Sequence, residues 1–193
     1  MVNIRHINEE LFYQIILVDF GNFDYIKFSK PLPISTLITT YFQLNGLDMT
    51  DAKEKIDKMV EDMNDCSEML DDYFSIKINP NTASLEALPR LIKGHKPSMA
   101  YLPDLMYHLG TNVDWMEEEG CVRDMSTQLA RFYARTPDKA LTEDEYLNWS
   151  NIAEHLFFPL YKSLLYPSNQ LTDRQTFHTV ANITDLYKVF ERC

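Results

Sequence analysis

Residues 51–78 read DAKEKIDKMVEDMNDCSEMLDDYFSIKI, and this stretch decides the fold class. Its apolar residues recur at intervals of three and four from Ile56 to Leu70, with charged residues between them. This pattern predicts a long amphipathic helix over about 51–72. From Tyr73 to Ile78 apolar and polar residues alternate, which is typical of a strand. A long helix followed directly by a strand predicts an α+β domain.

Helices dominate the sequence on both sides of this stretch, so we expect a helix-rich α+β fold. The predicted helices cover 9–20, 35–44, 51–72, 103–109, 115–134, 142–158 and 185–190. The predicted strands cover 25–29, 73–78 and 176–182. The segment 85–92 contains Pro89, which has no N–H to donate, so we expect an edge strand or irregular chain there.

Particular residues mark the ends of some of these helices. Asn8 is the expected N-cap of the first helix, and Gly21 ends it. Residues 142–145 form a capping box that opens the helix running toward Phe158. Pro159 should kink or end that helix, because proline removes a helical hydrogen bond.

Composition and charge exclude several classes of protein. The 193 residues include 18 Lys and Arg against 29 Asp and Glu, a net charge of −11. This balance disfavours a domain that binds DNA or RNA through its own phosphate contacts.

The longest uninterrupted apolar run, 15–18, is too short to cross a bilayer, so we expect no membrane span. Three scattered cysteines, Cys66, Cys121 and Cys193, indicate a reducing compartment. A partner-binding module fits this composition best.

Few residues form a recognisable chemical motif. None of the five histidines has the spacing of a metal site with another histidine or cysteine. Glu117, Glu118 and Glu119 follow Trp115 where a helix is expected to begin. They are either a solvated first turn that suits the helix dipole or an acidic patch that receives a basic, aromatic peptide.

The last nine residues, 185–193, read DLYKVFERC. They resemble the terminal signature of the MLH-type subunit of eukaryotic MutL homologues, which act in DNA mismatch repair. Residues 9–15, EELFYQI, and 69–75, MLDDYFS, resemble two further stretches of the same family. The resemblance extends over essentially the whole chain and implies the C-terminal dimerisation region of a nuclear protein.

The resemblance implies a two-lobed fold. One lobe, for dimerisation, would come from both ends of the chain, 1–29 and 115–193. The external lobe, 30–114, would be inserted between them.

The family's nicking motif, D-Q-H-A-x-x-E-x-x-x-x-E, is absent. Residues 3–6, Asn-Ile-Arg-His, occupy the D-Q-H-A slot, and Gln14 replaces the second glutamate. Glu9 matches the first, but Arg5 would repel a metal ion. We therefore expect a non-catalytic subunit. The alternatives are a self-sufficient metal-dependent nuclease acting as a homodimer and a direct nucleic-acid-binding domain; the missing ligands and the charge disfavour them.

The resemblance also implies partners. A PMS-type or meiotic MutL homologue would pair with apolar faces near both chain ends, with Phe12, Ile16, Phe132, Leu156 and Phe177 as candidates. The tail Phe190, Glu191, Arg192 and Cys193 would dock on the partner, where Cys193 would join its zinc site. No cofactor of its own is expected. Contact with DNA would be indirect.

A second site is implied for short basic-aromatic peptides of exonucleases or helicases. Its candidate residues are Trp115, Glu117, Glu118 and Glu119, with Glu118 the strongest. Their carboxylates would pair with Arg and Lys of the peptide.

Overall fold

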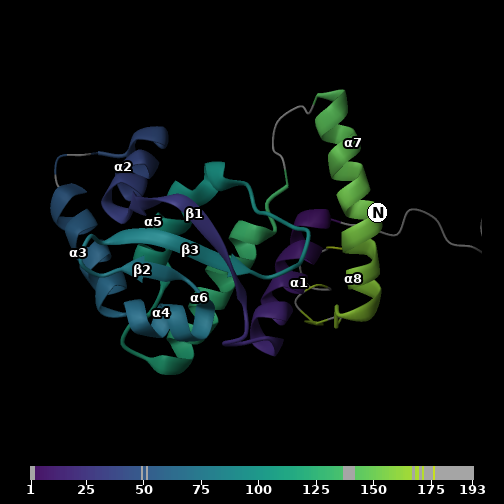
Figure 1. Ribbon diagram of the computed structural model, residues 1–193, viewed down its shortest axis with the longest axis horizontal. Helices are drawn as coiled ribbons and strands as arrows, with labels where there is room; N and C mark the ends of the chain where they lie inside the picture. The colour runs from purple at the N-terminus through teal and green to yellow at the C-terminus, as the bar shows by residue number, and fades with distance from the viewer. Residues whose placement is uncertain are drawn as a thin grey trace, which may run out of the picture.

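Helices surround one small antiparallel sheet in the computed structural model, as Figure 1 shows. The structure describes residues 3–48, 50, 52–136, 142–166, 168–169, 171 and 176. The predicted helix-rich α+β class is confirmed. The helices around the sheet include α2 (Ile34–Leu44), α3 (Ala52–Asp65), α4 (Ser67–Phe74) and α5 (Leu102–Asn112), the last preceded by the 3₁₀ turn η1 (Met99–Tyr101). The prediction for α2 was accurate to one residue.

The sheet has the strand order β1-β3-β2, and both pairs are antiparallel. Its strands are β1 (Asp24–Pro33), β2 (Lys77–Asn79) and β3 (Ser84–Arg90). The predicted boundary between lobes, at residues 29 and 30, lies within β1. The strand predicted over 176–182 and the helix predicted over 185–190 lie outside the described residues, apart from Thr176.

The segment with Pro89 is the central strand β3, so the expectation of an edge or irregular segment was wrong. Pro89 is opposite Tyr25 of β1, whereas the pairing with β2 ends at Ala87. At Pro89, β3 therefore has a neighbouring strand on one side only. A residue without an N–H is tolerated at such a locally unpaired edge. The Pro89 carbonyl also accepts a hydrogen bond from the buried Tyr133 hydroxyl.

The long helix predicted over 51–72 is two helices, α3 and α4, separated at Cys66. The strand predicted over 73–78 is reduced to β2, because α4 continues to Phe74. Leu70 and Phe74 are both fully buried and lie four residues apart, so helical packing prevails over the local alternation. Ser75, in the left-handed region (φ 52°), then ends the helix.

Two long helices, α1 (Ile4–Val18) and α6 (Glu118–Tyr133), pack on each other and form the centre of the core. Met125, Leu129 and Phe132, which lie on one face of α6, are buried. The N-cap of α1 is Asn3, which accepts from the His6 N–H, so the assignment of Asn8 was wrong. Asn8 is instead buried inside the helix, where the Tyr161 hydroxyl donates to its side chain.

A helical arm, α7 (Glu143–Ile152), η2 (Ala153–Phe157) and α8 (Phe158–Ser163), lies beside α1 (Figure 1). Pro159 does not end this helix. The π-helical turn η2 lies just before it, and such a turn alters the hydrogen-bond spacing locally. Phe157 anchors the arm against Phe12 of α1, with ring centroids 6.1 Å apart. None of the helices in the described ranges is long and apolar enough to cross a bilayer.

His95 joins the loop after β3 to three of these elements. Its ring lies 5.4 Å from Phe12, 5.3 Å from Phe157 and 6.5 Å from Tyr133, between ring centroids. Its Nε2–H donates to the Tyr133 carbonyl at 3.2 Å. Burial lowers the pKa of His95, and this hydrogen bond opposes the shift only in part. The fold therefore favours the neutral imidazole.

We predict that His95 makes the fold less stable at acidic pH. Its pKa is lower in the folded than in the unfolded chain, so the contribution is complete above pH 6.5 and is lost as pH falls below that value. The free energy of unfolding, measured with urea at pH 7.5, 6.5 and 5.5, should decline less steeply in His95→Phe than in the natural chain. His155→Gln, at an exposed histidine, should leave the slope unchanged. Equal slopes in all three proteins would contradict this role.

Candidate functional site

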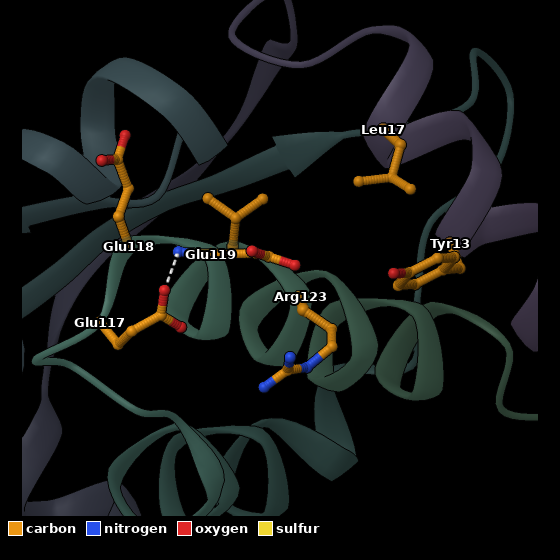
Figure 2. A pocket seen from close by; sticks show the side chains of 7 residues that line it. Tyr13, Leu17, Glu117, Glu118, Glu119 and Arg123 are labelled. Carbon is orange, nitrogen blue, oxygen red and sulfur yellow. Dashed lines mark hydrogen bonds between the residues drawn. The ribbon is translucent and has the colours of Figure 1, made fainter.

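A hollow of about 550 Å³ lies between α1 and the first turns of α6. We call it the acidic hollow. It is lined by Tyr13, Leu17, Glu117, Glu118, Glu119, Val122 and Arg123. Figure 2 shows that two helices far apart in sequence form its walls. The apolar wall comes from α1, through Tyr13 and Leu17, which are four residues apart and therefore lie on one helix face.

Glu117 is the N-cap of α6. Its carboxylate accepts hydrogen bonds from the backbone N–H of Glu119, at 3.1 Å, and of Gly120. Gly120 permits this close approach, because a Cβ at that position would lie 2.6 Å from Glu117 Oε2. The carboxylate of Glu117 is therefore committed to the helix end, where it also suits the positive end of the dipole.

Glu118 and Glu119 are exposed in the first turn of α6, and their side chains make no hydrogen bond or ion pair with any described residue. In Figure 2 the side chain of Glu119 points across the hollow toward Tyr13. The side chain of Glu118 points away from Tyr13 and Leu17. Arg123 is the one cation among the lining residues. It pairs with Asp124 at 3.2 Å, so the hollow keeps a negative charge.

Exposed apolar residues occur in the lining of the acidic hollow or next to its lining residues in the sequence. Leu17 is 45% exposed, the following Val18 is 81% exposed, and Met116, next to the N-cap, is 95% exposed. A negative hollow with an apolar wall can accept a ligand that carries both a cation and an aromatic or aliphatic side chain.

Three of the four residues predicted for the peptide site line this hollow. Trp115 does not: it is half-buried against the core, and its buried Nε1 has no partner among the described residues. Sequence reasoning missed Tyr13 and Leu17. Their spacing on the first predicted helix was visible, but the sequence does not tell which helix that face meets.

A second, smaller hollow, of about 220 Å³, lies at the other end of the same two helices. We call it the arginine hollow. Its polar lining is Arg5, Glu9, Asp104, His108, Gln128, Arg131 and Arg135. Arg5 Nε and Glu9 Oε1 are 3.2 Å apart, so the residue that matches the nicking motif's first glutamate contacts an arginine. Within the described residues, no three His, Cys, Asp or Glu side chains form a group that could hold a metal ion.

The candidate pairing residues lie in different environments. Phe12 and Ile16 are fully buried in the core of the single chain, and Phe132 is 3% exposed. These three side chains have almost no surface to offer a second subunit. Leu156 is half-buried. Phe177, Phe190, Glu191, Arg192 and Cys193 lie outside the described residues.

Exposed apolar residues lie instead on the helical arm. Tyr146, Leu147 and Phe158 are 62%, 53% and 58% exposed, and Tyr166, just after α8, is 77% exposed. Tyr166 is held by Gln14 of α1, which donates to its carbonyl and accepts from its N–H, both at 2.8 Å.

Comparison with known proteins identifies the family. The sequence model described as "DNA mismatch repair protein Mlh1 C-terminus" matches residues 1–193. The chain belongs to the Mlh1 C-terminal family. The resemblance seen in the sequence is thereby confirmed.

Similar proteins include two that are named as DNA mismatch repair proteins. The chain is 35% identical to DNA mismatch repair protein MLH1 of Saccharomyces cerevisiae over 95% of its length. It is 30% identical to Mlh1 of Dictyostelium discoideum and 28% identical to putative MutL protein homolog 1 of Schizosaccharomyces pombe, over its full length in both cases. It covers 26%, 24% and 28% of these three proteins, about a quarter of their length.

We predict that Glu117 stabilises the fold while Glu118 does not. Replacing Glu117 with alanine removes the acceptor for two N–H groups and should lower the free energy of unfolding by about 1 kcal/mol. Glu118→Ala, the adjacent residue with the same charge, should change it by less than about 0.5 kcal/mol. Urea unfolding of both variants tests this. Equal losses would mean that Glu117 does not cap α6.

Proposed function

We propose that this chain is the non-catalytic pairing and recruitment region of an Mlh1-type mismatch repair subunit. It recruits repair factors by binding basic-aromatic peptides, such as those of exonucleases or helicases, in the acidic hollow. The observation that carries this proposal is the hollow itself, in which the carboxylate of Glu119, unpaired among the described residues, lies opposite the aromatic and aliphatic side chains of α1.

The chemistry of the hollow favours such a peptide over other ligands. Glu119 and Glu118 can pair with arginine or lysine, and the wall made by Tyr13 and Leu17 can pack against an aromatic ring. The negative charge of the hollow repels a phosphate backbone. We therefore assign the contact with DNA to partner proteins rather than to this chain.

We further propose that the chain pairs with a PMS-type or meiotic MutL homologue. An obligate interface of this kind buries about 2,000 Å² or more and is rich in apolar surface. The exposed apolar residues of the helical arm supply such surface, and we place the pairing face there, around Tyr146, Leu147 and Phe158. Leu156 lies on the same arm. The division into a dimerisation lobe, 1–29 with 115–193, and an external lobe, 30–114, belongs to this proposal.

The catalytic metal site belongs, in this proposal, to the partner. The tail, with Phe190, Glu191 and Arg192, would dock there, and Cys193 would supply a thiolate ligand to its zinc. The pairing of Arg5 with Glu9 supports a non-catalytic role, because a guanidinium beside the remaining carboxylate opposes cation binding. It weighs equally against the alternative of a self-sufficient nicking homodimer. The proposed location is the nucleus.

The peptide site is tested by charge removal. A synthetic peptide with two arginines and two phenylalanines should bind the chain, and Glu119→Gln should weaken its affinity about tenfold, since a charge-assisted contact is lost. Glu54→Gln, at another exposed first-turn glutamate, on α3, is the matched control and should change the affinity by less than twofold. Fluorescence anisotropy measures both. Equal effects of the two substitutions would show that only overall charge attracts the peptide.

The pairing face is tested by introducing a charge. Mixed with the C-terminal domain of a PMS-type subunit, the chain should form a one-to-one complex in light scattering. Phe158→Asp should abolish the complex, because a buried unpaired carboxylate is costly. Leu44→Asp, at an apolar residue that is 73% exposed on α2, should leave it intact. A complex that survives Phe158→Asp would exclude the helical arm as the pairing face.

A further inference from the structure

The arginine hollow concentrates positive charge in a chain whose net charge is −11. Arg5 of α1, Arg131 of α6 and Arg135, just after α6, line it from different directions, and Asp104 and His108 of α5 complete the wall. Three guanidinium groups thus face two carboxylates, Glu9 and Asp104.

Two of the three guanidinium groups are paired. Arg5 contacts Glu9, as described above, and Arg135 donates to Asp104 while lying 4.2 Å from the centroid of the Tyr101 ring. These contacts fix both groups in place. Arg131 is exposed and forms no ion pair with any residue that the structure describes, so its charge is available to a ligand.

We treat the imidazole of His108 as neutral, so it adds no positive charge to the hollow. Asn112 Nδ2 lies 3.1 Å from its Nδ1, which fits an imidazole whose proton is on Nε2, toward Asp104. Burial lowers the pKa of His108, and Arg131 and Arg135 contribute to the same shift, against the opposing effect of Asp104. The hollow therefore keeps an excess of one positive charge from Arg131 at neutral pH.

Gln128 is the second, independent sign of a ligand. It lines the hollow, is only 6% exposed, and its side-chain amide makes no hydrogen bond within the described part of the chain. The residue is largely buried, yet its amide is open to the hollow and has no hydrogen-bond partner among the described residues, so a ligand in the hollow could bond to it. The dipole at the C-terminal end of α6 accounts for an arginine in its last turn. The dipole does not explain why Arg5 of α1 also lines the hollow. Nor does it explain why Gln128, which lines the hollow with these arginines, has no hydrogen-bond partner in the described ranges.

We propose that the arginine hollow binds one oxyanion, a phosphate or carboxylate group, carried by a side chain of a partner peptide. The free guanidinium of Arg131 and the amide of Gln128 would donate to its oxygens, while Arg5 and Arg135, by pairing with the two carboxylates, leave the charge of Arg131 uncancelled. Nucleic acid fits less well, because the cations converge on one small hollow rather than follow the line of a backbone, and the rest of the chain is acidic. This site is separate from the acidic hollow and does not rest on the function proposed for it.

Inorganic phosphate is the first probe, titrated into the chain at pH 7.5 and constant ionic strength and followed by NMR. Binding should saturate, with shifts in the last turns of α6. Arg131→Gln should weaken it about tenfold, and Lys93→Gln, the same loss of charge at an exposed lysine outside the hollow, by less than twofold. No saturation, or equal effects of the two substitutions, would overturn the proposal.

Gln128→Leu separates a built site from diffuse attraction, because it removes the amide without changing any charge. We expect phosphate affinity to fall at least threefold while the melting temperature stays about the same, since the substitution removes no hydrogen bond to a described residue. Unchanged affinity in this variant would overturn the site. If Arg131→Gln lowers the melting temperature, Arg131→Lys, which keeps the charge but loses the planar fork, should still weaken binding.

Competition then identifies what carries the anion. A short peptide with one phosphoserine or one glutamate should displace phosphate, and its serine or glutamine counterpart should not. Displacement by duplex DNA, together with failure of both anionic peptides, would assign the hollow to nucleic acid and overturn the peptide proposal.

Discussion

The packing of α1 on α6 is the constraint on which the rest of the structure depends. The buried side chains of α1, including Leu11, Phe12 and Ile16, fill the space against Met125 and Leu129 of α6. The two helices run in opposite directions, because the end of α1 meets the start of α6 in the acidic hollow and the start of α1 meets the end of α6 in the arginine hollow. His95, Phe157 and Tyr161 then attach the loop after β3 and the helical arm to this pair.

This arrangement gives one helix two sites of opposite charge. Acidic residues at the start of α6 and arginines at its end both suit the helix dipole, so they stabilise the helix without any ligand. The function we propose uses the same charges, since α1 adds an aromatic and aliphatic wall at one end and a third guanidinium at the other. Binding and stability therefore depend on different members of each cluster. Glu117 serves the helix end, whereas Glu119 is available to a partner.

Much of the fold could be predicted from the sequence where local and tertiary preferences agree. The boundaries of α2 and the helix-rich α+β class are examples, and the acidic cluster was found because its charges are consecutive. The errors lie where a distant contact prevails over a local pattern. Pro89 belongs to a central strand because β2 is short, and α4 runs through a strand-like alternation because Phe74 is needed in the core. The arginine hollow could not be seen in the sequence, since α1, α5 and α6 each contribute two polar residues that look ordinary alone.

Membership of the Mlh1 C-terminal family and the geometry of the acidic hollow together support our proposal that the chain recruits partners along the contact between α1 and α6. Mapping a basic-aromatic peptide onto the chain by backbone amide chemical shifts tests this most directly. We expect saturable changes at Tyr13, Leu17 and residues 117–123, with little change on α2 or α3. Changes centred on another surface, or none at saturating peptide, would contradict it.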